Sequence, residues 1–202
     1  MIAQLQGQCV HVEKGQIVIS AGGVGFGVLV PETLAERVSV GEEQLLYTQL
    51  IVRDNEMYLV GFASTAERDI FRLLVNVSGV GPKLALKILS VMTPNAFMIS
   101  VASNDAKALT KIPGVGNKTA KRLLLEMSGK FADKVKEELP LENEQSPGDL
   151  WTAAQEVLLS FGCSADEASA ALKAVGQEGL APSDDVSVDS IVMAAFKVLG
   201  QH

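Results

Sequence analysis

Histidine and cysteine are scarce in this chain of 202 residues, which holds two of each. Only His11 and His202 could act as imidazole bases or ligands, so the composition argues against most metal sites and against catalytic triads that need histidine. Cys9 and Cys163 stand far apart, each among apolar neighbours. We therefore expect buried thiols of a reducing compartment, not a metal or redox site.

Long apolar runs are missing as well. No stretch of 18 consecutive apolar residues occurs, and the first residues, MIAQ, hold no basic segment followed by an apolar one. We therefore expect neither a membrane-spanning helix nor a secretory signal. Apolar residues still make up 48% of the chain, which is enough for a core and for more than one domain.

The net charge of −7 is unevenly distributed along the chain. Residues 1–62 carry three basic and seven acidic side chains, and the residues from 143 onward carry two basic and nine acidic ones. Residues 71–130 instead carry nine basic and two acidic side chains. A concentrated positive field favours nucleic acid, because cations that neutralise phosphates release counterions. The alternative is that these lysines only solvate helix surfaces.

Within the basic segment, one motif occurs twice. Residues 78–85 read SGVGPKLA, and residues 113–120, 35 positions later, read PGVGNKTA. A helix, a Gly-Val-Gly turn and a second helix can hold a phosphate, because the glycines permit a tight turn and the second helix presents its N-terminal N–H groups. Neither copy is a nucleotide-binding P-loop, since Asn117 stands where a glycine must precede the Lys-Thr pair. We expect no ATP site and no cofactor.

The chemistry expected at each turn is anion capture. Backbone amides near the glycines would donate to phosphate oxygens, and the lysines two positions after the second glycines would add charge. Such contacts position a nucleic-acid backbone and read no bases, so binding should be independent of sequence. The alternative is a pair of ordinary helix–turn–helix joints. The predicted phosphate-binding residues are Gly79, Gly81, Lys83, Gly114, Gly116, Lys118, Thr119 and Arg122.

The pattern of apolar residues predicts a multidomain α+β protein. Residues 1–63 read as short strands of a small closed barrel, most simply an OB-fold, and residues 64–139 as an all-α domain with two hairpins. Residues 140–149 are polar and aperiodic, as in a flexible linker, and residues 150–202 predict three short helices that dock a protein. The predicted strands are 1–5, 9–12, 17–19, 25–30, 45–52 and 57–62, and the predicted helices are 64–75, 82–91, 94–101, 105–111, 117–127, 150–161, 164–175 and 187–199.

A second candidate site is the turn at residues 53–56, Arg-Asp-Asn-Glu, between two apolar strands. Acidic residues at a hairpin tip usually contribute only solubility. On a surface that faces DNA they would repel phosphates and guide strands apart. Both interpretations remain open at this point.

In this order, the segments resemble RuvA, the family of bacterial Holliday-junction-binding subunits of the branch-migration machinery. The resemblance covers essentially the whole chain and rests on residues 52–54 (VRD), 61–62 (GF), 79–85 and 113–120. It implies an N-terminal OB-fold barrel, a central tandem helix-hairpin-helix domain and a C-terminal three-helix, UBA-like domain. It also implies a non-catalytic subunit without metal or cofactor. Such subunits bind an open four-way junction as a homotetramer or as two face-to-face tetramers.

The resemblance also implies roles for single residues. The acidic pin of the family falls on Asp54 and Asn55, where the family has two adjacent acids, and Glu56 is the candidate for restoring the missing charge. Asn117 replaces a lysine that often precedes Lys118. The C-terminal domain would contact RuvB, the hexameric ATPase motor, and the resolvase RuvC is a further partner that the resemblance suggests. Such proteins are cytoplasmic and associate with the bacterial nucleoid. Candidates for the motor contact, or for the core of the small domain, are Leu158, Leu159 and Leu172.

Two rival functions remain. The second motif also resembles that of helix-hairpin-helix DNA glycosylases, which need a catalytic aspartate about one helix later at the lip of a base-sized pocket. The nearest aspartate is Asp133, in a charged stretch unlike a pocket wall. The other rival is a non-specific DNA-binding accessory module of a nuclease or polymerase, against which the barrel with its acidic hairpin and the acidic C-terminal segment argue.

Overall fold

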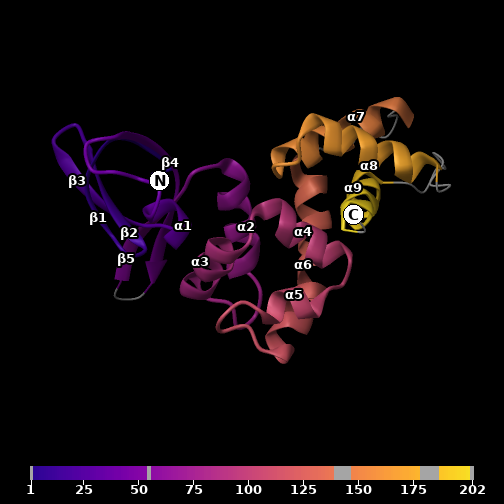
Figure 1. The fold of residues 1–202 in the computed structure, drawn as a ribbon, viewed down its shortest axis with the longest axis horizontal. Coiled ribbons are helices and arrows are strands. Elements are labelled where there is room, and N and C mark those ends of the chain that lie inside the picture. The colour runs from indigo at the N-terminus through magenta and orange to yellow at the C-terminus, as the bar shows by residue number, and fades with distance from the viewer. Residues whose placement is uncertain (1, 54–55, 139–146, 178–186, 201–202) are drawn as a thin grey trace. The chain divides into compact units, whose positions relative to one another are not determined.

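The computed structural model describes residues 2–53, 56–138, 147–177 and 187–200. The chain forms two compact units, and the segments of each are interleaved in the sequence. One unit comprises Met1–Val75 and Val80–Thr93, and the other comprises Asn76–Gly79 and Pro94–His202. The five strands found among the described residues all belong to the first unit (Figure 1).

The strands form a closed barrel in the order β1-β2-β3-β5-β4. Neighbouring strands are antiparallel except β3 and β5, which pair in parallel. A short helix, α1 (Glu32–Ala35), which the sequence analysis missed, connects β3 to β4. This arrangement confirms the expected OB-like barrel in a multidomain α+β chain. The strands are β1 (Gln4–Glu13), β2 (Gln16–Ala21), β3 (Val24–Leu29), β4 (Glu43–Arg53) and β5 (Glu56–Phe62).

The first strand closes the barrel by bending. β1 pairs with β4 through its first half and with β2 through its second, and its register shifts between Cys9 and His11. The two strands predicted at 1–5 and 9–12 are therefore one strand with an irregularity, since a bulge bends a strand without ending it. Gly7 lies before this shift, paired with Gln44 of β4, and a Cβ there would clash with the carbonyl oxygen of Ser20. The barrel core includes Leu5, Cys9, Ile17, Ile19, Val28, Leu46 and Leu59.

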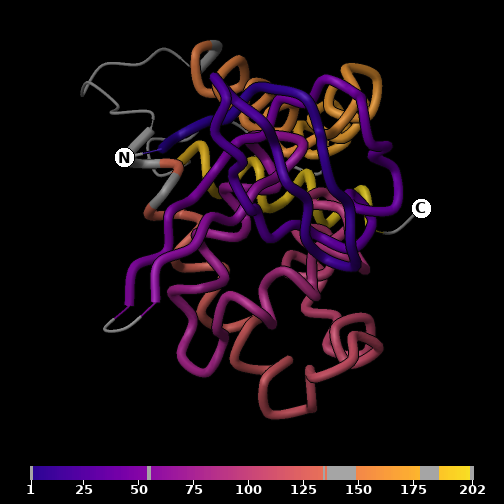
Figure 2. Tube along the Cα trace, turned by 90° about the vertical axis from the view of Figure 1, so that its left-hand side faces the viewer, coloured from indigo at the N-terminus to yellow at the C-terminus, as the bar shows by residue number. Residues whose placement is uncertain are grey.

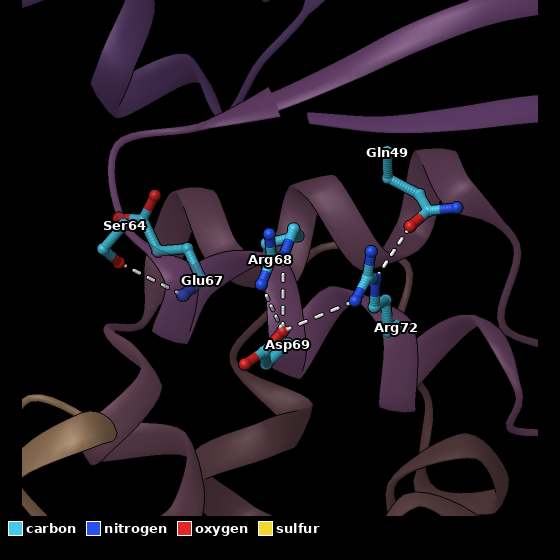
Figure 3. Close-up of polar contacts among 6 residues, drawn as sticks. All are labelled: Gln49, Ser64, Glu67, Arg68, Asp69 and Arg72. Carbon is cyan, nitrogen blue, oxygen red and sulfur yellow. Dashed lines mark hydrogen bonds and ion pairs between the residues drawn. The ribbon is translucent and has the colours of Figure 1, made fainter. Parts of the chain in front are cut away.

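Helix α2 (Thr65–Val75) is capped by the side chain of Ser64. The Ser64 hydroxyl accepts the N–H of Glu67 at 3.2 Å, and the Glu67 carboxylate accepts the N–H of Ala63 at 3.0 Å. At the other end, Arg72 donates from Nε to Oε1 of Gln49 on β4 at 2.7 Å (Figure 3). Helix α2 is thus fixed to the barrel that precedes it.

The second unit contains six helices over its described residues. Helix α6 runs well past the predicted end at 127, and its apolar face continues through the buried Phe131 and Val135. Both positions follow Met127 at intervals of four residues, so they extend the same helical face. The six helices are α4 (Pro94–Ala102), α5 (Ala106–Thr110), α6 (Asn117–Glu138), α7 (Pro147–Ser160), α8 (Ala165–Gln177) and α9 (Val188–Leu199).

An aromatic cluster joins α6 to the C-terminal helices. The ring of Phe131 lies 5.2 Å from that of Phe161 and 6.3 Å from that of Phe196, and all three side chains are buried. Edge-on packing of this kind adds to the stabilisation from burial alone. Figure 1 shows α7, α8 and α9 grouped beside α6. The division into domains at 63/64, 139/140 and 149/150 stays a prediction.

Helix α8 begins at a capping box formed by residues 164–167. Glu167 accepts hydrogen bonds at 2.8 Å from both the N–H and the hydroxyl of Ser164, whose hydroxyl in turn accepts the N–H of Glu167. These bonds favour the ionised carboxylate, with the backbone bond contributing most, and lower the pKa of Glu167 below its ordinary value.

Both cysteines are buried free thiols, as the sequence analysis expected. Burial, and secondarily the charge of Glu167, raises the pKa of Cys163 to about 11. No single helix in the described part of the chain is long and apolar enough to cross a membrane, although the bent pair of α3 (Pro82–Val91) and α4 together reaches that length and composition.

Candidate nucleic-acid interface

The sequence repeat is also a structural repeat. Each copy consists of a helix, a turn and a second helix: α2 and α3 (Pro82–Val91) form the first hairpin, and α5 and α6 form the second. Apolar residues 35 positions apart are buried alike in the two copies. The pairs are Leu74 and Leu109, Val77 and Ile112, Val80 and Val115, Ala85 and Ala120, Ile88 and Leu123, and Leu89 and Leu124.

The first glycine of each turn adopts a backbone conformation that favours glycine. Gly79 has φ of +84° and Gly114 has φ of +94°. A side chain at either position would be strained, because a Cβ in this region meets the following carbonyl oxygen. The valine between the glycines points inward in both copies, with Val80 and Val115 each 4% exposed. The backbone turns sharply around a buried valine, which explains the Gly-Val-Gly pattern.

The second glycine of each turn borders open space. A Cβ built on Gly81 or Gly116 meets no atom within 4 Å. The backbone there leads directly into a helix, since Ala85 N–H bonds to Gly81 O at 3.0 Å and Ala120 N–H to Gly116 O at 2.9 Å. The first N–H groups of these helices lack intrahelical acceptors and form the positive ends of the helix dipoles.

No acidic residue occupies the first turn of α3 or of α6. Helices α2, α8 and α9, in contrast, each carry aspartate or glutamate in their first turn. The hairpin helices therefore present their N-terminal N–H groups without a competing carboxylate of their own first turn. The exposed Lys83 and Lys118 and the half-buried Thr119 stand in the same turns. This arrangement suits an external anion.

Arg122, which the sequence analysis placed among the phosphate ligands, contacts the protein itself. Its Nη1 donates to the carbonyl oxygen of Ser78 at 2.9 Å and lies 3.3 Å from the Ser78 hydroxyl. The N–H of Ser78 points to Glu126 Oε2 at 3.4 Å. Sequence reasoning missed Ser78 and Glu126, and the only available signal was the four-residue spacing of Arg122 and Glu126, which places them on one helical face.

The acidic hairpin is described in part. Asp54 and Asn55 lie outside the described residues, and Glu56 is an exposed residue at the start of β5, opposite Arg53 of β4. Figure 2 shows the two strands running side by side up to this segment. Next to these, Val52 and Met57 form a cross-strand pair, and their exposed fractions of 67% and 74% are unusually high for apolar side chains.

The leucines considered for a motor contact separate into two groups. Leu158 is fully buried and Leu172 is 7% exposed, so both belong to the apolar core around the C-terminal helices. Leu159 is 41% exposed on α7 and is the one of the three that a partner could reach. Asp133, the aspartate that a glycosylase would need, is exposed on α6.

Comparison with known proteins adds independent information on both units. The sequence model described as the RuvA N terminal domain matches residues 1–61, and that of the SAM-like helix-hairpin-helix tandem matches residues 71–128. A curated protein of Symbiobacterium thermophilum, "Holliday junction branch migration complex subunit RuvA", is 42% identical, and the alignment covers 98% of each chain. The protein of the same name from Laribacter hongkongensis is 40% identical over the full length of both chains.

The chain belongs to the RuvA family. A third RuvA, from Herpetosiphon aurantiacus, is 40% identical over 91% of this chain. The match of the RuvA N-terminal model coincides with the five-stranded barrel, and the match of the tandem model contains both Gly-Val-Gly turns. Membership in RuvA therefore agrees with the geometry of both regions.

Proposed function

We propose that this chain binds Holliday junctions and takes part in branch migration as a DNA-binding subunit. The observation that carries the proposal is the duplicated hairpin, in which both copies combine a positive-φ glycine, a glycine that borders open space and a lysine in the first turn of a helix. The names of its relatives, which are subunits of a Holliday junction branch migration complex, support the same function.

The phosphate groups of the DNA backbone are the ligand of each turn. Backbone amides at the glycines donate to phosphate oxygens, while Lys83 and Lys118 add charge and Thr119 adds a hydroxyl. These groups contact no base edges, so binding is independent of sequence. The positive charge of residues 71–130 within an acidic chain supports steep dependence on salt.

The acidic hairpin separates strands and does not grip them. Asp54 and Glu56, with Asn55 between them, supply a negative tip that repels phosphates where strands exchange partners. Neutralising the pair in the variant D54N/E56Q should leave junction affinity unchanged or higher and alter branch migration. A collapse of junction binding in this variant would refute the proposed role of the hairpin.

Specificity for a four-way junction comes from assembly. Two hairpins in each subunit of a homotetramer, or of two face-to-face tetramers, would hold all arms of the junction.

The subunit itself is non-catalytic. The ATPase RuvB acts as a separate partner at the C-terminal helices, RuvC is a further candidate partner, and the complex works on the bacterial nucleoid.

The deciding experiment compares a four-way junction with a linear duplex of equal length and base composition in competition binding. We expect the junction to be bound more tightly at every salt concentration, with and without Mg²⁺. The variant K83Q/K118Q should weaken binding to all sequences alike. The control K173Q removes an exposed lysine from α8 and should bind as the parent does.

The same assays address the rival functions. Equal affinity for junction and duplex would support a non-specific accessory module. Release of a base from damaged duplex would support a glycosylase, and loss of that activity in D133N would identify its catalytic aspartate.

A further inference from the structure

Two side chains of α6 contact a single residue of the first Gly-Val-Gly turn. Arg122 donates to the Ser78 carbonyl oxygen at 2.9 Å, and Glu126 accepts the N–H of Ser78 at 3.4 Å. Ser78 therefore has both its backbone donor and its backbone acceptor engaged by side chains from the second hairpin. We call these three residues the Ser78 clamp.

The Ser78 clamp is absent from the repeat itself. At the offset of 35 residues, Ser78 corresponds to Pro113, which has no backbone N–H to donate. Arg122 and Glu126 correspond to Lys87 and Val91. Helix α3 therefore cannot hold the second turn in the way that α6 holds the first. The Ser78 clamp is therefore not part of the duplicated Gly-Val-Gly motif, and it holds the first turn alone.

The contact also bears on the donor that the turn offers to DNA. The Ser78 carbonyl and the Gly79 N–H belong to the same peptide group. A guanidinium that binds this carbonyl polarises the peptide, and hydrogen bonds in such a chain strengthen one another. Holding Ser78 thus strengthens the Gly79 N–H as a phosphate donor and keeps Gly79 in its positive-φ conformation.

We propose that Arg122 and Glu126 are positioning residues that hold the first Gly-Val-Gly turn in its phosphate-binding form, and that Arg122 acts through Ser78 and not as a phosphate ligand. This inference depends on the proposed function in one respect, namely that the first turn binds DNA phosphate. The clamp itself is a property of the free protein and can be tested without DNA.

The first test is hydrogen exchange in the free full-length chain. We expect the turn amides of residues 78–81 to exchange about tenfold faster in R122Q, because the loss of a charge-assisted bond lets the turn open more often. The control K121Q removes a neighbouring exposed lysine of α6 and should exchange as the parent does. Unchanged exchange of these amides in R122Q would overturn the proposal.

Glu126 allows a test in which two explanations predict different relative affinities of the variants E126A and E126Q. If this carboxylate acts on DNA only through its negative charge, E126A and E126Q should both bind a junction more tightly than the parent, and equally so. If it holds Ser78, then E126Q keeps an oxygen acceptor whereas E126A does not. We then expect E126A to bind about threefold more weakly than E126Q.

The dependence of junction affinity on salt separates positioning from direct contact. A lost phosphate contact lowers the slope of log K against log salt by about 0.9. We expect R122Q to lower affinity while keeping the slope of K121Q, and K118Q to lower both. A slope in R122Q as reduced as that in K118Q would overturn the assignment of Arg122. Equal affinity of the parent chain for junction and duplex would refute the proposed function, while hydrogen exchange in the free chain would still test the Ser78 clamp.

Discussion

The hydroxyl of Ser90 on α3 accepts a hydrogen bond from the backbone N–H of Glu32, the first residue of α1, at 2.8 Å. The same hydroxyl donates to the carbonyl oxygen of Leu86, also at 2.8 Å. One side chain therefore connects the second helix of the first hairpin to the helix between β3 and β4. This contact, like that of Arg72 with Gln49, attaches the hairpin helices to the barrel.

Replacing Ser90 by alanine should lower the free energy of unfolding by about 1 kcal/mol, because the N–H of Glu32 loses its partner. The matched control is S128A in α6, since the Ser128 hydroxyl donates to the Leu124 carbonyl in the same way. Alanine favours helix more than serine does, so S128A should be neutral or slightly stabilising. Urea denaturation would measure the free energy of unfolding of S90A and S128A. Equal stability of the two variants would contradict the role of Ser90.

The two glycines of a turn should respond differently to alanine. G79A places a Cβ at φ of +84° and should cost about 1–2 kcal/mol of stability. G81A and G116A place a Cβ in open space, so stability should hold or rise slightly. Their junction affinity should nevertheless fall, because the new methyl groups occupy the side from which phosphate approaches. Unaltered affinity in G81A and G116A would show that phosphate does not approach there.

The lysines of the two hairpins should contribute equally to the salt dependence of DNA binding. Both are exposed in the first turn of a helix without an acidic neighbour in that turn. We expect K83Q and K118Q each to lower the slope of log K against log salt by about 0.9 for every phosphate that the lysine neutralises. Fluorescence anisotropy over a salt series would measure the slopes. A slope unchanged from that of K173Q would remove the lysine from the interface.

The thiol of Cys163 should make stability depend on pH in the alkaline range. Its pKa is raised in the folded chain to about 11, against 9.0 ordinarily, so the folded state holds the proton more tightly than the unfolded state does. The resulting stability is complete below pH 9 and is lost as the pH rises through 11. The difference in unfolding free energy between the parent and C163A should therefore shrink from pH 9 to pH 11. A constant difference would contradict the raised pKa.

Much of the fold could be predicted because its signals are local. Strand alternation, turn glycines and the helical period depend on neighbours only a few residues apart, so β5 and α3 were found within one residue of their observed bounds. Errors arose where packing decides. Helix α6 continues to Glu138 because Phe131 packs against Phe161 and Phe196. The residues near position 127 do not predict this tertiary contact.

For the candidate interface too, some features could be predicted from the sequence and others depend on tertiary structure. The duplicated Gly-Val-Gly turn, its lysines and the separation of charge were evident from the sequence by itself, because a repeat and a charge count need no coordinates. The partner of Arg122 was decided only by tertiary structure. Ser78 lies 44 residues away from Arg122 in the chain, and a hydrogen bond over that separation follows from how the hairpin elements pack, which leaves no periodic trace in the sequence.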